Sequence, residues 1–177
     1  MPIEKFSNYL YDTIDAINLL YKHKLIGQML IIMYSAIDSF GLIDSKLSNN
    51  KATGETFQNW VEKYILKNSK INANPIDLWS SRCSLLHTHT SKSDLTNKEK
   101  AKEIQYFSGN RKNPKMISIL NITPLISSQN NIPIIIEELI ESFCNGLIDF
   151  ESNFKEKVKV NSHWINRVNQ VLSKRQI

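Results

Sequence analysis

The stretch LIGQMLIIMYSAIDSFGLI, residues 25–43, decides the fold class of this chain. Apolar residues repeat in it at intervals of three and four, the spacing that places side chains on one face of a helix. Further apolar residues between them widen this face to most of the helix surface. A helix that is apolar on most sides lies at the centre of a bundle or at an interface. Residues 25–43 therefore predict the central helix of a mainly α protein.

Helical spacing of apolar residues recurs on both sides of residues 25–43. A short hinge at 22–24 joins the preceding segment to them. After a polar loop at 44–54, Thr53 can cap the next helix. Pro133 stands near the start of a long segment toward the C-terminus, where proline is tolerated. The expected helices are 3–21, one carrying Phe57 to Ile65, 75–89, 134–154 and 162–173.

The helix expected at 75–89 has the clearest start signal in the chain. Asn74 can accept a backbone N–H as a cap, and Pro75 suits the first helical position. Asp77 complements the positive end of the helix dipole. The same segment has an apolar face and a polar face. The apolar face consists of Ile76, Trp79, Cys83 and Leu86, and the polar one of Ser80, Ser81, Arg82 and Ser84.

Residues 103–122 differ from the helical segments in their residue types and in the spacing of their apolar residues. Two β-favouring runs flank a turn-rich cluster at 108–114, which contains Gly109 and Pro114. This pattern predicts a two-stranded β-hairpin. No linker is long enough to divide the chain. The expected architecture is therefore a single domain over residues 1–177, a mainly α helical bundle with one small inserted hairpin at about 103–122.

Composition limits the classes of function. The chain of 177 residues has 22 basic and 17 acidic residues, and its charge of +5 permits weak attraction to phosphates without indicating nucleic-acid binding. No secretory signal and no window of about 18 uninterrupted apolar residues is present, so we expect a cytoplasmic protein without a membrane span. Cys83 and Cys144 have no CxxC spacing, which argues against a disulfide framework or a zinc site.

The sequence motifs of the large enzyme classes are absent. The chain has no GxxxxGK[ST], GxGxxG, HExxH or GxSxG. Glu137, Glu138 and Glu141 have a spacing that could hold a metal, but no matching Glu and His pair occurs on another expected helix. A solvated acidic face is the favoured interpretation. We therefore expect neither a metal nor a cofactor.

One cluster that can carry chemistry remains, RCSLLHTH at residues 82–89, in which four residues separate Arg82 from His87. Here the chain resembles the HEPN superfamily, small helical proteins whose ribonuclease members share an Arg, four to six residues, His signature. The segment DLWSSRCSLLHT at 77–88, with SDL at 93–95 and KAK at 100–102, looks like uncharacterised bacterial members of that group. Many active members have Asn, Asp or His directly after the arginine, where this chain has Cys83.

The resemblance implies a metal-independent endoribonuclease that acts as a homodimer. Residues five apart on a helix are separated by about 140° around its axis and about 7.5 Å along it, so Arg82 and His87 cannot form one tight site as helix neighbours. In HEPN relatives a two-fold dimer packs this helix against its copy and combines both pairs. Histidine can then serve the proton transfers and arginine can stabilise the phosphorane, giving 2′,3′-cyclic phosphate ends. Ser84 and His89 are candidate accessory residues.

Two other interpretations stay open. Arg82 could pair with Asp77 or another carboxylate, and His87 could be a hydrogen-bonded residue at a helix end, where a cation is favourable. The chain would then be a catalytically silent helical module that binds nucleic acid, nucleotide or a partner protein. If it is active, the resemblance is compatible with a toxin or defence effector and with a partner antitoxin. The sequence does not name the RNA that is cut.

Overall fold

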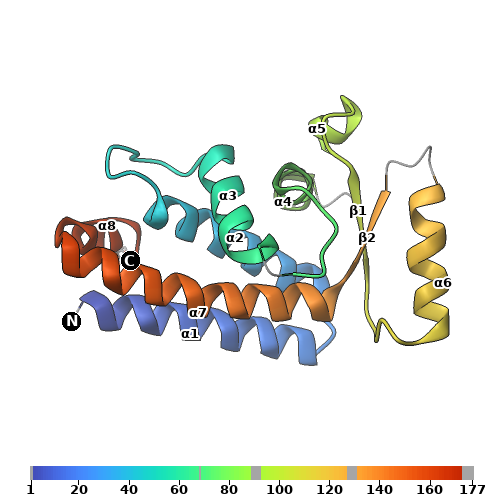
Figure 1. The fold of residues 1–177 in the computed structure, drawn as a ribbon, viewed down its shortest axis with the longest axis horizontal. Helices are drawn as coiled ribbons and strands as arrows, with labels where there is room; N and C mark the ends of the chain where they lie inside the picture. The colour runs from blue at the N-terminus through green and yellow to red at the C-terminus, as the bar shows by residue number, and fades with distance from the viewer. Residues whose placement is uncertain (1, 68, 89–92, 127–130, 173–177) are drawn as a thin grey trace. The chain divides into compact units, whose positions relative to one another are not determined.

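The computed structural model describes residues 2–67, 69–88, 93–126 and 131–172. The fold is mainly α, as expected, with one two-stranded sheet in the described part of the chain (Figure 1). The chain divides into two compact units. Unit 1 consists of Met1–Trp60 and Cys144–Ile177, and unit 2 of Val61–Phe143. The expectation of a single domain over residues 1–177 stays a prediction.

Unit 1 is built around the apolar helix that the sequence places at its centre. Helix α2 (Ile26–Asp44) packs against α1 (Pro2–Lys22), α3 (Gly54–Trp60) and α8 (His163–Val171). The C-terminal part of α7 (Ile136–Val160) completes the unit (Figure 1) and contacts α1, since Ser7 donates a hydrogen bond to Glu151. The expected bounds of α1, α2 and α8 are confirmed to within about two residues. The helix expected to continue to Ile65 ends as an α-helix at Trp60 and is followed by a π-helix at Val61–Leu66. Helix α7 extends beyond its expected end at 154 to Val160. Nine residues of α2 are buried: Met29, Leu30, Met33, Tyr34, Ala36, Ile37, Phe40, Gly41 and Ile43.

An aromatic cluster joins four helices of unit 1. The ring of Phe150 on α7 lies 5.3 Å from that of Phe6 on α1, measured between centroids. It lies 5.5 Å from Phe40 on α2 and 5.7 Å from Trp60 at the end of α3. All four side chains are at most 1% exposed. Such pairs each contribute about 0.5–1.5 kcal/mol beyond the burial of their area, so this cluster is a main stabilising feature of the unit.

Helix α2 is also long and apolar enough to cross a membrane, the one helix in the described ranges that meets this condition. Half of its apolar window is buried inside the protein, as in the core helix of a soluble domain. Its contacts with α1, α3 and α8 explain why its residues are apolar on so many sides. The interpretation of α2 as a central packing helix is therefore consistent with these contacts.

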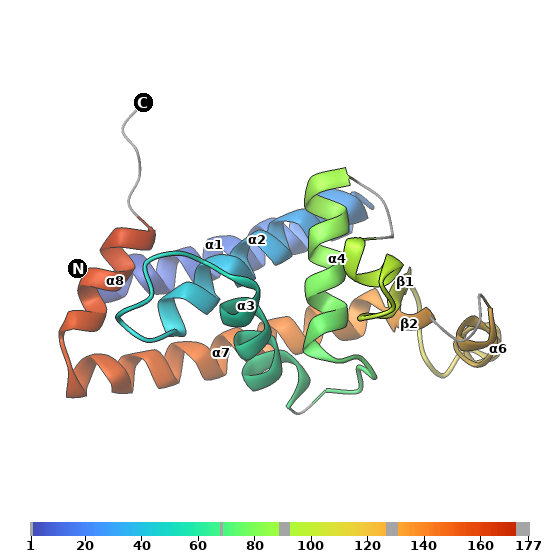
Figure 2. The same cartoon turned by 90° about the horizontal axis from the view of Figure 1, so that it is seen from above.

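Unit 2 contains the parallel sheet and the helix with the Arg and His pair. Strand β1 (Glu103–Phe107) pairs in parallel with β2 (Asn131–Ile135), from Glu103 opposite Asn131 to Phe107 opposite Ile135. Figures 1 and 2 show helix α4 (Pro75–Thr88) on the β1 side of this sheet and α6 (Pro114–Ile122) on the β2 side. Its other helices are a π-helix, η1 (Val61–Leu66), the short α-helix α5 (Asp94–Asn97) and a 3-10 helix, η2 (Thr123–Leu125), besides α4 and α6.

The expected β-hairpin at 103–122 is wrong in its second half. Residues 114–122 form helix α6, and the true partner of β1 is the distant β2. The Asn113 side chain accepts the N–H of Lys115 at 2.9 Å, and Pro114 occupies the first turn. This is the Asn-Pro start signal that the sequence also has at the beginning of α4. A parallel pair needs a crossover, and α6 with η2 lies within it.

The start of α7 also differs from the expectation. Helix α7 begins at Ile136 instead of 134, because residues 131–135 are extended and pair with β1. Pro133 lies inside β2, opposite Gln105. Each strand of a two-stranded sheet is an edge strand, so a residue without an N–H is tolerated there. Pro133, expected near the start of the helix, is therefore part of a strand.

Candidate functional site

The first turn of α4 is fixed by one buried carboxylate. Asp77 is 1% exposed, and its Oδ2 accepts the backbone N–H of Asn74 at 2.8 Å. Its Oδ1 accepts the backbone N–H of Lys102, just before β1, at 2.7 Å. Both oxygens of Asp77 are thus used by backbone groups. The alternative in which Arg82 pairs with Asp77 is not the arrangement of this structure.

The serine face of α4, Ser80, Ser81 and Ser84, is buried and packs inside unit 2. Ser80 Oγ lies 2.5 Å from Ser93 Oγ and 2.9 Å from Thr96 Oγ1. Ser81 Oγ shares a hydrogen bond of 2.8 Å with the hydroxyl of Tyr106 on β1. Buried hydroxyls are stable when they bond to one another. The serine face therefore attaches α4 to both α5 and β1.

Ser84, a candidate accessory residue, belongs to this internal face. Its side chain is 2% exposed, and its Oγ donates to the carbonyl oxygens of Ser80 at 3.2 Å and Ser81 at 3.0 Å. These bonds direct the hydroxyl at the backbone of its own helix. Ser84 is thus placed on the opposite side of α4 from the half-exposed face described next.

The apolar face of α4 is half-exposed, which reverses the usual relation between polarity and burial. Trp79, Cys83 and Leu86 are all intermediate in exposure, whereas the serines are buried. Arg82 is also half-exposed, and its guanidinium carbon lies 4.9 Å from the centroid of the Trp79 ring. This distance is within the range of a cation–π interaction. The guanidinium is thereby held on the half-exposed face and not on the serine face.

His87 is in the last turn of α4, on the same helix as Arg82. The side chain of His87 and the whole of His89 lie outside the described residues. A helix turns by about 100° per residue, so Trp79, Cys83 and Leu86 have positions around the axis between those of Arg82 and His87. We call the face defined by Trp79, Arg82, Cys83 and Leu86 the Arg82 face. Arg82 and the position of His87 lie at its two edges.

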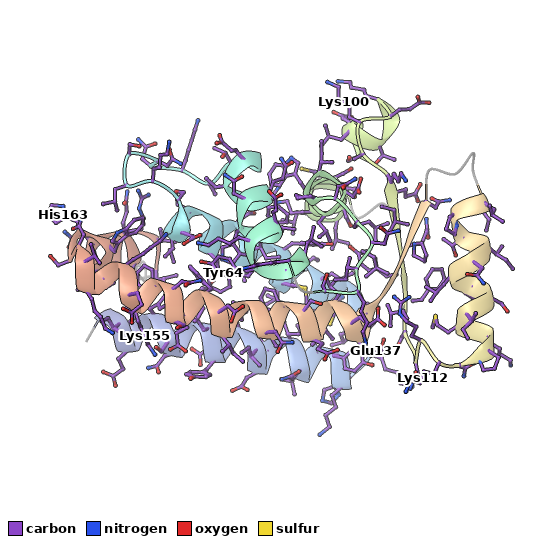
Figure 3. All side chains as sticks on the ribbon, viewed as in Figure 1. Tyr64, Lys100, Lys112, Glu137, Lys155 and His163 are labelled. Atoms are coloured by element: carbon purple, nitrogen blue, oxygen red, sulfur yellow. The ribbon has the colours of Figure 1, made fainter. Side chains whose placement is uncertain are left out.

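The glutamates at the start of α7 hold a loop instead of forming a solvated face. Glu137 accepts the hydroxyl of Ser108 at 2.5 Å and the N–H of Gly109 at 3.0 Å. Glu138 accepts two hydrogen bonds from Arg111, both of 2.6 Å, and these bonds raise the pKa of the guanidinium. Figure 3 shows Glu137 close to this loop. Among the described residues no group of three or more His, Cys, Asp or Glu side chains could hold a metal.

Sequence reasoning found the helix of Arg82 and His87 but missed how it is attached. The buried Asp77 had a signal, since an acidic residue three positions after a capping residue commonly accepts the N–H of that residue. The burial of the serine face had no signal, because the apolar residues of α4 predict burial of the opposite face.

Comparison of the chain with protein-family models, curated proteins and solved structures finds no match.

Proposed function

We propose that this protein is a metal-independent endoribonuclease of the HEPN type, active as a cytoplasmic homodimer, in which Arg82 of one copy acts with His87 of the other. The observation that carries the proposal is the Arg82 face of α4. It presents Trp79, Cys83 and Leu86 half-exposed, with a permanent cation at one edge. Two copies of an apolar helix face can bury each other in an isologous contact.

Such a contact would bring an arginine and a histidine together although Arg82 and His87 of one copy lie at different positions around the helix axis. Within one copy, residues 82 and 87 lie about 140° apart around the helix axis. A two-fold axis that runs beside the Arg82 face and parallel to α4 would bring the arginine edge of one helix toward the histidine edge of its copy. The composite cleft would then hold two arginines and two histidines. The geometry of a single α4 therefore fits a dimeric site better than a monomeric one.

The chemistry uses groups that these two residue types provide. A neutral imidazole removes the proton of the ribose 2′-hydroxyl, and the 2′-oxygen forms a bond to phosphorus. The bond between phosphorus and the 5′-oxygen breaks, and the imidazolium formed in the first step returns its proton to that oxygen. The guanidinium donates hydrogen bonds to the phosphorane oxygens while their charge is greatest. The products are a 2′,3′-cyclic phosphate and a 5′-hydroxyl, and no water is consumed in this step.

The direct test is incubation of the purified chain with total tRNA in excess EDTA, followed by a denaturing gel. We expect discrete fragments with the unmodified chain and none with Arg82→Ala or His87→Ala. Exposed His163→Ala on α8 is the matched histidine control and should cleave normally. The fragments should accept phosphate from polynucleotide kinase at their 5′ ends without prior phosphatase treatment. Intact RNA in every lane would favour the catalytically silent binding module.

A mixing experiment separates a composite site from a site within one copy. Arg82→Ala and His87→Ala are each inactive alone, but a mixed dimer has one site with an intact Arg and an intact His from different copies. Random exchange gives mixed dimers as about half of the total, each with one of two sites, so about a quarter of full activity should return. No recovery in the mixture, with exchange verified by mass spectrometry, would contradict action across the dimer.

A toxin or defence role is a further part of this proposal. A helical ribonuclease of this size would need control inside the cell that makes it, and a partner antitoxin would provide that control. Expression of the unmodified chain should then slow growth, whereas expression of His87→Ala should not. Equal growth with both chains, in cells where each is shown to accumulate, would argue against this role.

A further inference from the structure

Unit 2 has a pocket of about 330 Å³ whose lining is basic and amide-rich. It lies between the loop that leads into α4, the end of α6 with η2, and strand β2. No aspartate or glutamate is among the described residues that line it. A pocket of this size is at the lower end of the range for small-molecule sites. Its polar side chains include Lys70, Lys102, Arg111, Asn72, Asn121 and Asn131.

Two lysines that line this pocket, Lys70 and Lys102, have no carboxylate counter-ion among the described residues. Both lysines are exposed. Arg111 uses two of its N–H donors on Glu138, which balances its charge and leaves other donors for a ligand. Asp77 accepts the backbone N–H of Lys102, but its charge is balanced by two backbone groups and by the positive end of the α4 dipole.

The amide and apolar residues of the lining narrow the class of ligand. Asparagine amides present both donors and acceptors, so they can bond to a polar ligand whatever the direction of its groups. Asn131 is 7% exposed and donates to the carbonyl of Ile126 at 3.1 Å, which holds its side chain in place. Leu120, Ile132 and Pro133 give the pocket an apolar wall. The ligand should therefore join an anionic group to a part with polar edges and a flat apolar surface.

We propose that this pocket binds a phosphate monoester carried by a nucleoside, either a free nucleotide or the phosphorylated 5′ end of an RNA. A monoester has a charge of about −1.5 to −2 at pH 7, which matches the two unpaired lysines. An internal phosphodiester has a single charge and matches them less well. The planar fork of Arg111 can supply hydrogen bonds to phosphate oxygens in addition.

This pocket is distinct from the proposed catalytic site and does not depend on it. Asn74, in its lining, precedes α4, whereas Arg82 and His87 are eight and thirteen residues further along the chain. At 1.5 Å per residue these separations are about 12 Å and about 20 Å along the helix axis, and Arg82 does not line the pocket. Loss of cleavage in the Arg82→Ala variant should therefore leave phosphate binding unchanged. That variant is also the suitable protein for titrations with RNA.

The test is calorimetric titration of the full Arg82→Ala chain with AMP, adenosine, and a trinucleotide RNA with or without a 5′ phosphate. We expect AMP or the phosphorylated RNA to bind at least tenfold more tightly than its unphosphorylated counterpart. Binding of AMP identifies a free nucleotide as sufficient, and binding of the phosphorylated RNA alone identifies an RNA end. No preference for the phosphorylated member of either pair would overturn the proposal.

Charge-matched variants test whether the pocket is the binding site. Lys70→Gln with Lys102→Gln removes the two unpaired charges and should weaken binding at least tenfold. Lys98→Gln with Lys100→Gln removes the same charge from the turn after α5, where Figure 3 shows Lys100, and should have little effect. Neither Lys98 nor Lys100 lines the pocket. An equal loss in both double variants would assign the binding to general charge and overturn the proposal.

Discussion

The carboxylate of Asp77 joins two parts of unit 2 that lie 25 residues apart, because its Oδ1 accepts the backbone N–H of Lys102 at 2.7 Å. Its Oδ2 accepts the N–H of Asn74 at 2.8 Å. One side chain therefore fixes both the start of the helix that carries Arg82 and the approach to strand β1. The position of the Arg82 face depends on this bond as much as on the helix itself.

Asp77→Asn should destabilise the protein by about 1.5–3 kcal/mol, the usual contribution of hydrogen bonds to a charged group. The amide retains one acceptor, but its nitrogen would face an N–H that it cannot accept. The free energy of unfolding in urea, followed by circular dichroism, measures the effect. Asp94→Asn is the control, since Asp94 is exposed in the first turn of α5. Equal losses in the two variants would show that the buried bonds add nothing.

Helices α2 and α3 of unit 1 approach so closely at Gly41 that a side chain there has no room. A Cβ at this position would lie 2.5 Å from the carbonyl oxygen of Thr56, which is backbone and cannot move aside cheaply. Gly41→Ala should therefore lower the free energy of unfolding by about 1–3 kcal/mol. Gly27→Ala on the same helix meets no atom within 4 Å and should raise it by up to about 1 kcal/mol. Urea unfolding of both variants tests this difference in sign.

Apolar periodicity was a good guide to the helices and a poor one to the strands. Helices α1, α2, α4 and α8 follow the spacing of their apolar residues, because burial of one face favours that spacing. The region 116–122 was assigned to a strand since β-branched Ile117, Ile119 and Ile122 favour extended structure. Its Asn113-Pro114 start signal nevertheless outweighs this weak preference. Parallel pairing of β1 with β2 leaves no local pattern, because the strands are joined only through the intervening crossover.

The candidate site was only partly accessible to sequence reasoning. The placement of Arg82 and His87 on one helix was predictable from the capping residues of α4. The burial of Ser80, Ser81 and Ser84 was not, because hydroxyl groups become internal only when distant partners such as Tyr106 are supplied by the fold. The basic pocket could not be predicted from the sequence either. Lys70, Lys102 and Arg111 come from three separate segments that the sequence does not link.

Arg167 on α8 donates hydrogen bonds to the backbone of the loop that follows α2 in unit 1. It is 4% exposed, and its guanidinium donates to the carbonyl oxygens of Leu47 at 2.7 Å, Lys46 at 3.1 Å and Asn49. Burial lowers the pKa of this guanidinium, but not enough to discharge it near neutral pH. A lysine ammonium lacks the planar fork that reaches several carbonyls at once. The loop thus depends on the shape of this side chain as well as its charge.

Arg167→Lys should lower the free energy of unfolding by about 1.5–3 kcal/mol and speed tryptic cleavage at Lys46 and Lys51. Lys159→Gln is the control, since Lys159 pairs with exposed Glu156 and such surface pairs contribute about 0–1 kcal/mol. Urea unfolding and mass spectrometry of the early tryptic fragments supply the two readouts. If Arg167→Lys behaves like Lys159→Gln in both, the fork geometry has no structural role.

The stability of unit 1 depends on pH through the carboxyl group of Glu151. Burial acts to raise the pKa of Glu151, but hydrogen bonds from Lys155 and Ser7, at 2.8 and 2.5 Å, outweigh it and hold the pKa below its ordinary value of 4.5. A carboxyl with a lowered pKa in the folded state stabilises the protein above its unfolded pKa. This contribution is lost as the pH falls through the lower, folded value.

The difference in unfolding free energy between the unmodified chain and Glu151→Gln should therefore be constant near pH 6 and shrink as the pH falls below 4.5. Its size should be about 1 kcal/mol or less, because Lys155 is half-exposed and solvent screens the pair. Ser7→Ala removes one of the two donors and should reduce the same pH dependence without abolishing it. A difference that grows toward acid pH would mean that burial dominates at Glu151, and would reverse the assigned direction of its pKa.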